Sequence, residues 1–196
     1  VRATGEPTYF LSDIAYHLNK LERGFYHLIN VWGTDHHGYV ARLAAALQAV
    51  ADRPYELRVI LFQLVNLVRG GVRIAMSTRE GAFVTLDEVI AEVGADVARF
   101  FLLQKSPDTH VDFDFDLAKE RSLANPVYYI QYAHTRCCGI AREAQAVGVR
   151  EGDGTGTWTA PQERELLLKL CWYEDVLEAC AARHAPNYLC TYLLDV

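Results

Sequence analysis

Several features that would assign a protein class at once are missing from this sequence of 196 residues. No run approaches the ~18 consecutive apolar residues of a transmembrane helix. The first ten residues, VRATGEPTYF, lack the basic and then apolar pattern of a secretory signal. Acidic residues outnumber basic ones, and a net charge of -6 argues against a protein that coats polyanions generally. We therefore expect a cytoplasmic protein without a membrane span, whereas a nucleic-acid partner stays open because such binding depends on local patches.

Cysteine pairs with the spacing of a metal or redox site are also absent. The five cysteines are odd in number, no Cys-x-x-Cys occurs, and the adjacent Cys137 and Cys138 cannot easily hold one ion. Reduced, mostly buried thiols are the expectation. Apolar residues make up 51% of the chain, enough to build the core of one domain, or of a large and a small one.

Alternating apolar and helical patterns predict an α/β fold over the first part of the chain. The expected elements are a strand over 8–11, a helix capped by Ser12 or Asp13 and ending near Glu22, a strand over 25–32, a helix over 36–50 and a strand over 57–68. This order favours a parallel sheet with helices on its faces, which places ligands at the carboxyl ends of its strands. The polar residues near those ends are Tyr9, Asp13, Asp35 and His36.

The rest of the chain reads as mainly helical. Thr85 and Glu88 have the spacing of a capping box, and Gly94 ends the helix that they open. The further elements expected are a helix over 95–104, a strand over 110–115, a helix over 125–146, a glycine-rich linker over 148–158 and a helix over 161–184. The acids at 112, 114 and 116 lack the glycine turn and distal glutamate of a calcium loop, so strand alternation and a helix cap explain them better.

The segment RIAMSTREG, residues 73–81, looks like a loop that holds an anion. Arg73 and Arg79 are its only cations, and Ala75 and Thr78 stand where lysines would strengthen such a loop. A weakened phosphate-facing loop is the favoured interpretation, and an ordinary turn is the alternative.

Five stretches, taken in order, resemble arginyl-tRNA synthetases, a class I synthetase family. They are PTYFLSDIAYHLNKLERGF, WGTDHHGYVARL, MSTREGAFVTLDEV, ADVARFFLLQKSPDTHVDFDFDLAKE and NPVYYIQYAHTR. The resemblance runs from about Pro7 to Arg142 and is weaker in the helical tail. Each stretch alone is a weak signal, but five in one order make chance similarity improbable.

The resemblance implies a fold, a domain division and a reaction. Residues 1–122 would form the C-terminal half of a Rossmann-like parallel-sheet catalytic domain, and residues 123–196 the start of an all-α anticodon-binding module. The reaction would be ATP-dependent activation of L-arginine and its transfer to tRNA(Arg), with Mg²⁺ entering with ATP and no metal held by the protein. Full-length family members are expected to be monomers, whereas an uncovered sheet edge predicts self-association of the isolated chain.

The resemblance assigns Tyr9, Asp13 and Asp35 to arginine binding. A carboxylate at Asp13 can pair bidentately with a guanidinium, and the Tyr9 hydroxyl can add a hydrogen bond. The alternative is that Asp13 only caps a helix and Tyr9 packs in the core.

The resemblance assigns two segments to ATP. Gly33, Asp35 and His36 match a turn that faces the adenosine, where glycine allows close approach of the backbone. Asp35 cannot easily serve the ribose and the arginine at once. His36 and His37 diverge by ~100° at a helix start, so a shared metal is not expected. The second segment is the loop, where the resemblance places Met76, Ser77 and Arg79 beside the triphosphate, with Ser77 and Arg79 as catalytic candidates.

The family's Lys-Met-Ser-Lys-Arg signature has lost both lysines here. Loss of a cationic donor to a developing phosphate charge costs ~3 kcal/mol, so the loop would depend on a cation from outside it. Arg73 could supply that cation only if the hairpin folds back.

The helix over 125–146 carries the tRNA-binding candidates Tyr132, Arg136 and Arg142. An arginine can pair with phosphate, and a tyrosine can stack on a base. A connecting helix with ordinary packing tyrosines is the alternative.

The His-Ile-Gly-His signature of class I synthetases does not occur in the sequence. We therefore expect the isolated chain to be inactive and to act as part of a larger synthetase. The alternatives are a non-catalytic tRNA- or arginine-binding paralogue, or a fragment that binds partner proteins.

Overall fold

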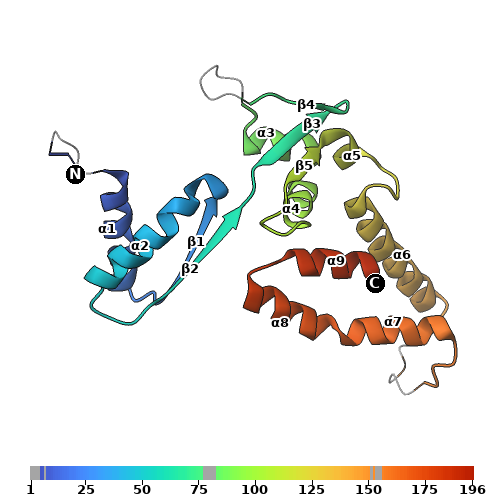
Figure 1. The fold of residues 1–196 in the computed structure, drawn as a ribbon. Helices are drawn as coiled ribbons and strands as arrows, with labels where there is room; N and C mark the ends of the chain where they lie inside the picture. The colour runs from blue at the N-terminus through green and yellow to red at the C-terminus, as the bar shows by residue number, and fades with distance from the viewer. Residues whose placement is uncertain (1–4, 7, 77–82, 151, 153–155) are drawn as a thin grey trace. The chain divides into compact units, whose positions relative to one another are not determined.

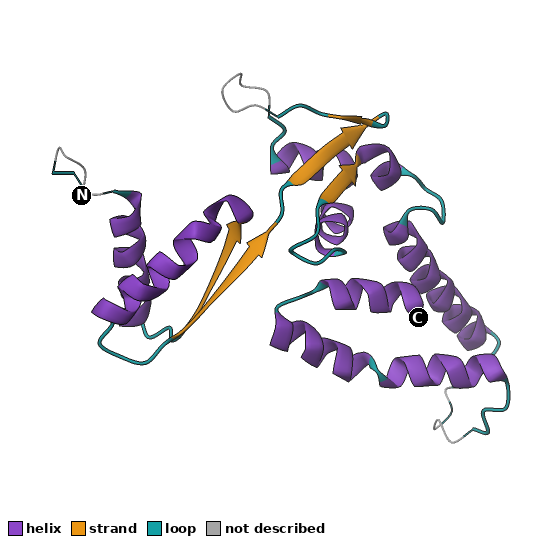
Figure 2. Cartoon of the chain, viewed as in Figure 1, coloured by secondary structure: helices purple, strands orange, loops and turns teal. Residues whose placement is uncertain are grey.

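The chain has a mixed α/β fold that is mostly helical and contains two small sheets (Figures 1 and 2). The structure, a computed structural model, describes residues 5–6, 8–76, 83–150, 152 and 156–196. It divides into two compact units, of which the first comprises Val1–Leu64 with Pro107–His110 and the second Val65–Ser106 with Val111–Val196.

The first unit is a β-α-β arrangement preceded by a helix. Its elements are α1 (Tyr9–Glu22), β1 (His27–Gly33), the 3-10 turn η1 (Thr34–His36), α2 (His37–Val50) and β2 (Glu56–Phe62). β1 and β2 pair in parallel from His27 opposite Glu56 to Gly33 opposite Phe62, and α2 forms the crossover. The core of this unit is built from leucines on α1, β1 and α2, namely Leu21, Leu28, Leu43 and Leu47.

The start of α1 differs from the prediction. Residues 9–11 belong to the helix and form no strand, and Thr8 is its N-cap, so the predicted caps Ser12 and Asp13 lie inside the helix. A run of four residues is too short for its apolar pattern to separate strand from helix. The change matters because it moves Tyr9 and Asp13 onto one helix.

The second unit combines a small sheet with helices. Its elements are β3 (Val65–Arg69), β4 (Val72–Arg73), α3 (Leu86–Val93), α4 (Ala95–Leu103), β5 (Val111–Asp114), α5 (Phe115–Lys119), α6 (Pro126–Ala146), α7 (Pro161–Cys171), α8 (Tyr173–Arg183) and α9 (Asn187–Asp195). β3 lies between β4 and β5, antiparallel to β4 and parallel to β5. The rings of Phe101, Phe113 and Phe115 pack at the centre of its core.

The single strand expected over 57–68 is two strands in different sheets. β2 pairs with β1, whereas β3 pairs with β4 and β5. The break falls at Gln63 and Leu64, where the Gln63 amide donates to the Pro107 carbonyl instead of continuing the ladder. The prediction of a single strand over 57–68 is therefore wrong, whereas the parallel pairing of β1 with β2 agrees with the predicted parallel sheet.

Side-chain caps set the starts of α3, α5 and α6, and the capping box of α3 was predicted. Thr85 and Glu88 form the capping box of α3, and the Asp114 side chain accepts from the amides of Asp116 and Leu117 at the start of α5. Asn125 caps α6 by accepting from the Val127 and Tyr128 amides. Between α3 and α4, Gly94 has φ +84°, a conformation that side chains disfavour.

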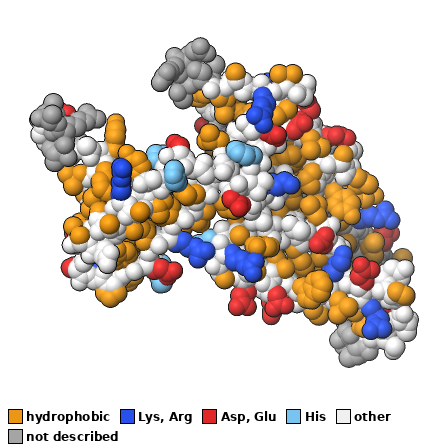
Figure 3. Space-filling view, in the orientation of Figure 1, with side chains coloured by type: hydrophobic (Ala, Val, Ile, Leu, Met, Phe, Trp, Pro, Cys, Tyr) orange, Lys and Arg blue, Asp and Glu red, His pale blue; other side chains and the backbone are white. Residues whose placement is uncertain are grey.

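The helix predicted over 161–184 is interrupted at Trp172, which separates α7 from α8. Apolar residues at helical spacing in this segment lie largely at the surface, since Leu166, Leu170, Tyr173 and Leu177 are all exposed. α9 packs against α8, α6 and α4, and Figure 3 shows hydrophobic side chains reaching the surface of the molecule.

The expectation that the thiols are mostly buried is also wrong: none of the five cysteines forms a disulfide, and Cys190 alone is buried.

Candidate functional site

The first unit contains a cavity of about 670 Å³ at the start of α1 and the end of β1. This volume lies within the ~300–1,000 Å³ that small-molecule sites occupy. Three of the predicted site residues line it, Tyr9, Asp13 and His36. The other lining residues are Thr8, Phe10, Trp32, Tyr39 and Arg42.

Tyr9 and Asp13 reach the cavity from one face of α1. They are four residues apart, the spacing that stacks side chains one above the other on a helix. Tyr9 is 85% exposed, so it is not a core residue. Asp13 lies within the helix and caps nothing. Both structural alternatives to a binding role, a helix cap and a core tyrosine, are therefore removed.

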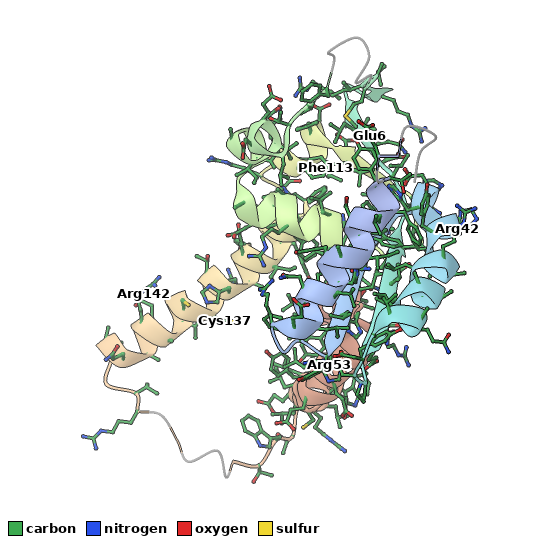
Figure 4. The ribbon with its side chains drawn as sticks, turned by 90° about the vertical axis from the view of Figure 1, so that its left-hand side faces the viewer. Glu6, Arg42, Arg53, Phe113, Cys137 and Arg142 are labelled. Carbon is green, nitrogen blue, oxygen red and sulfur yellow. The ribbon has the colours of Figure 1, made fainter. Side chains whose placement is uncertain are left out.

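Aromatic rings from β1, η1 and α2 form a second wall, which the sequence analysis did not identify. The Trp32 and His36 rings are 6.3 Å apart, the His36 and Tyr39 rings 6.2 Å, and the Phe10 and Tyr39 rings 6.2 Å between centroids. The guanidinium of Arg42 lies 5.5 Å from the Tyr39 ring centroid, and Figure 4 shows Arg42 extending from α2. A cavity with one carboxylate and several aromatic faces suits a planar cation.

A buried polar pair connects α1 with β1 next to this cavity. His17 on α1 is 4% exposed and Asn30 on β1 is 6% exposed. The His17 Nε2 atom lies 2.9 Å from Asn30 Nδ2, and its Nδ1 atom lies 2.7 Å from the backbone oxygen of Asp13. A helical reading of residues 8–11 would have revealed Tyr9, Asp13 and His17 as one stripe at intervals of four.

The predicted adenosine turn lies at the end of β1. A side chain on Gly33 would come within 2.5 Å of the Asp35 carboxylate oxygen, so glycine leaves room for Asp35 to fold back over the strand end. The Asp35 carboxylate lies 3.6 Å from His36 Nε2, and both side chains are exposed. Asp35 thus adjoins the cavity through His36 and does not line it.

The loop residues Ser77 and Arg79 lie outside the described residues. Met76 is described in the second unit and is 49% exposed. Arg73, the cation considered as a replacement for the absent lysines, lies 3.3 Å from the Asp112 carboxylate. Asn66 donates to the same Asp112 oxygen at 2.7 Å. Arg73 is therefore engaged by β5 and would have to leave this ion pair to reach a phosphate.

The tRNA-binding candidates lie along α6 (Figure 4, which labels Arg142). Arg136 Nη1 is 3.5 Å from the Tyr132 hydroxyl, and the Tyr128 and Tyr132 rings stack with centroids 6.3 Å apart. Tyr132, Arg136 and Arg142 are exposed, although Tyr132 also stacks on Tyr128 within the helix. The geometry presents a ring and a guanidinium together on a helix surface.

The described part of the chain also shows no metal cluster and no membrane-spanning helix. No group of three or more His, Cys, Asp or Glu residues among the described residues is placed to hold a metal ion. None of the described helices is long and apolar enough to cross a membrane.

One protein-family profile and several curated proteins are similar to this chain. The profile of the DALR anticodon binding domain matches residues 130–196, from α6 to the last residue. An arginine–tRNA ligase of Elusimicrobium minutum is 46% identical over 197 residues, covering 100% of this chain and 37% of its own length. The enzyme of the same name from Thioalkalivibrio sulfidiphilus is 47% identical over 200 residues, covering 100% of this chain and 34% of its own. The chain thus spans little more than a third of the curated relatives that it matches.

Solved structures show the same likeness. A Campylobacter jejuni crystal structure assigned to the arginyl-tRNA synthetases matches with a TM-score of 0.84 and 32% identity, over 100% of this chain and 43% of its own. The Thermus thermophilus arginyl-tRNA synthetase matches with a TM-score of 0.68 and 23% identity, over 100% and 40% of the two chains, which shows a shared fold.

Proposed function

Because the chain belongs to the arginyl-tRNA synthetase family, we propose that it acts in ATP-dependent activation of L-arginine and its transfer to tRNA(Arg), as part of a larger synthetase. The observation that carries the proposal is the cavity lined by Tyr9, Asp13 and His36. The partners would be L-arginine, ATP and tRNA(Arg), the enzyme would be a monomer, and its location would be the cytoplasm.

Asp13 gives the cavity its affinity for a guanidinium. Its carboxylate offers two acceptor oxygens to a planar fork of N–H donors, and such charge-assisted pairs are the stronger hydrogen bonds of proteins. The Tyr9 hydroxyl lies one turn away on the same helix and accepts another N–H. Trp32 supplies an aromatic face for the cation. Asp35 is the third arginine-binding candidate, and it would reach the ligand beside His36.

Activation is an in-line attack of the arginine carboxylate on the α-phosphate of ATP, which expels pyrophosphate. Alignment of the two anions and stabilisation of charge on the phosphates provide the acceleration. We assign the adenosine to the turn of Gly33, Asp35 and His36. We assign the triphosphate to Met76, Ser77 and Arg79, with Mg²⁺ bound to the ATP oxygens and not to ligands of this chain.

The domain division follows from the same proposal. Residues 1–122 would form the second half of a Rossmann-like catalytic domain, and residues 123–196 the start of the anticodon-binding module. The DALR match over 130–196 supports the second part. On α6, Arg136 and Arg142 would contact phosphates, and the exposed Tyr132 ring would stack on a base.

Arginine-dependent exchange of pyrophosphate into ATP tests the proposal on the complete gene product, assayed with tRNA(Arg) present. We expect exchange with L-arginine and none with L-lysine, whose ammonium lacks the planar fork. The 196-residue chain alone should show no exchange, because it contains no His-Ile-Gly-His segment. Robust exchange by this chain alone would contradict the assignment to half of an active site.

A non-catalytic paralogue is the second candidate, favoured by Ala75 and Thr78 at the positions of the two family lysines. Such a protein would bind L-arginine or tRNA without exchanging pyrophosphate. Exchange by the complete gene product excludes it, whereas binding without exchange supports it.

A further inference from the structure

His17 is a buried histidine that the proposed chemistry does not use. It lies on α1 at the end of the series Tyr9, Asp13, His17, whose successive members are four positions apart. Exposure falls from 85% at Tyr9 to 4% at His17, so the stripe runs from the open cavity into the interior. His17 is thus one turn beyond the carboxylate proposed to hold the ligand.

Hydrogen bonding indicates which nitrogen of the His17 ring donates to α1. The Asp13 carbonyl oxygen can only accept, so Nδ1, at 2.7 Å from it, carries a hydrogen and donates. Nε2 faces the side-chain amide of Asn30, whose nitrogen lies 2.9 Å and whose oxygen lies 3.1 Å from it, and in the neutral ring Nε2 accepts from the amide nitrogen. Both ring nitrogens therefore have hydrogen-bond partners: the Asp13 carbonyl oxygen on α1 for Nδ1, and the Asn30 side chain on β1 for Nε2.

Asn30 links His17 on α1 to β1, the strand that contributes Trp32 to the cavity lining. Leu28, Asn30 and Trp32 alternate along β1, so their side chains leave the strand on one face. Trp32 lines the cavity, and Asn30 is the preceding residue on that face. A specific polar pair thus joins the helix that bears Asp13 to the strand that bears Trp32.

We infer that His17 and Asn30 are positioning residues that hold Asp13 and Trp32 in register for the guanidinium. The inference rests on the proposed function and names residues to which the family resemblance gave no role. An apolar pair could fill the same volume, but it would not define how far α1 slides along β1, because dispersion contacts are not directional. A displacement of ~1 Å at a positioned group can reduce activity by roughly 100-fold.

The test compares His17→Leu, Asn30→Leu and the double variant in the complete gene product. Each single change should raise the KM for L-arginine by roughly 10- to 100-fold while the KM for ATP stays within about twofold. The double variant should be no worse than either single one, because both remove the same link. His17→Gln, whose amide can still reach Asn30, should recover part of the affinity.

His27→Gln is the matched control. His27 is the first residue of β1, is exposed, and bonds Glu56 at 2.9 Å without lining the cavity. The KM of the His27→Gln variant for L-arginine should equal that of the wild type. If the leucine variants do not fold, Asn30→Ser carries the test, since its short side chain is polar but cannot span the distance to Nε2.

The outcomes separate this inference from the proposed function. Lowered thermal midpoints with an unchanged arginine KM would show a purely structural pair and overturn the inference, as would equal rises in the KM for arginine and for ATP. Calorimetric titration of the wild type with L-arginine supplies the second readout. Binding without exchange would overturn the proposed activity, and the same variants would then test positioning through Kd. A wild type that neither binds nor activates L-arginine would overturn both.

Discussion

Tyr9 and Asp13 lie one helical turn apart on α1, and both side chains line one cavity together with Trp32. A phenol, a carboxylate and an indole face thus come from two short segments of the first unit. We propose that these groups bind a planar cation by complementary means: hydrogen bonds in the plane of the guanidinium, and a π-face against it.

Substitution of Asp13 by asparagine should raise the KM for L-arginine in the complete gene product by about 100-fold. The reason is that the guanidinium loses its charged, bidentate partner, and a charge-assisted hydrogen bond contributes roughly 1.5–3 kcal/mol. The measurement is arginine-dependent exchange of pyrophosphate into ATP, with KM determined for both substrates.

Glu22→Gln is the control for this change, because it removes an exposed carboxylate from the last residue of the same helix. It should leave both KM values unchanged. An arginine KM that is equal in Asp13→Asn and in the wild type would remove Asp13 from the binding site.

Substitution of Arg136 by glutamine should weaken tRNA(Arg) binding and lower the slope of log K against log salt concentration by about 1. The physical reason is the loss of one cation that neutralises a phosphate. Fluorescence titration over a range of salt concentrations measures both quantities.

The charge-matched control is Lys105→Gln, at an exposed residue just beyond α4. It changes the net charge equally, so an identical loss of affinity in both variants would show a general charge effect and no contact by Arg136. Tyr132→Leu should weaken binding without changing the salt slope, because stacking releases no counterion.

Substitution of Asn125 by alanine should lower the free energy of unfolding by about 2–4 kcal/mol. The Asn125 side chain accepts from the Val127 and Tyr128 amides, and its own amide donates to the carbonyls of Ala118 and Glu120. The residue is buried, so water cannot replace these partners. Urea unfolding followed by circular dichroism gives the value.

Asn125→Ser separates the two halves of this network. Serine keeps an acceptor for the helix amides and loses the donors to the two carbonyls. The Asn125→Ser variant should therefore lose less unfolding free energy than the Asn125→Ala variant. Equal losses of unfolding free energy in the serine and alanine variants would mean that the hydrogen bonds to the helix amides do not contribute to stability.

The capping box of α3 should depend on pH. The hydrogen bond from the Thr85 backbone N–H lowers the pKa of Glu88, and the Thr85 hydroxyl lowers it further. Because the folded-state pKa lies below that of the unfolded chain, the charged box stabilises the fold fully at neutral pH. This stabilisation is lost as the pH falls through the lowered pKa.

Glu88→Gln provides the comparison, since glutamine keeps the hydrogen bonds but does not titrate. The difference in unfolding free energy between wild type and variant should be largest near pH 7 and should decline in acid. A difference that is constant from pH 7 to pH 3 would show that the Glu88 charge makes no contribution.

Local chemistry made part of the fold predictable. Thr85 and Asn125 satisfy free helix amides with their own side chains, and both stand at helix starts that the sequence indicated. The parallel strands β1 and β2 and the crossover α2 also follow from their apolar patterns.

The errors arose where tertiary structure overrides a short pattern. The run over 57–68 is mostly apolar, and its sequence does not indicate that the Gln63 amide bonds the Pro107 carbonyl while the next residues join another sheet. Residues 8–11 are equally ambiguous, because a run of four residues with three apolar side chains fits a strand or a first helical turn.

The site was predictable in its reacting groups but not in its walls. Tyr9, Asp13, Asp35 and His36 were expected near one another because they are polar residues near strand ends. Tyr9, Asp13 and His36 line one cavity, whereas Asp35 does not. Trp32 and Tyr39 look like ordinary core aromatics in sequence. His17 and Asn30 are 13 residues apart, and their contact depends on how α1 packs on β1. The roles of Ser77 and Arg79 remain predictions.

The most direct test is a crystal structure of the complete gene product with L-arginine bound. We expect the guanidinium within hydrogen-bonding distance of the Asp13 carboxylate and the Tyr9 hydroxyl, with the indole of Trp32 against the ligand. Arginine bound at another surface, with no ligand density between α1 and β1, would contradict the account.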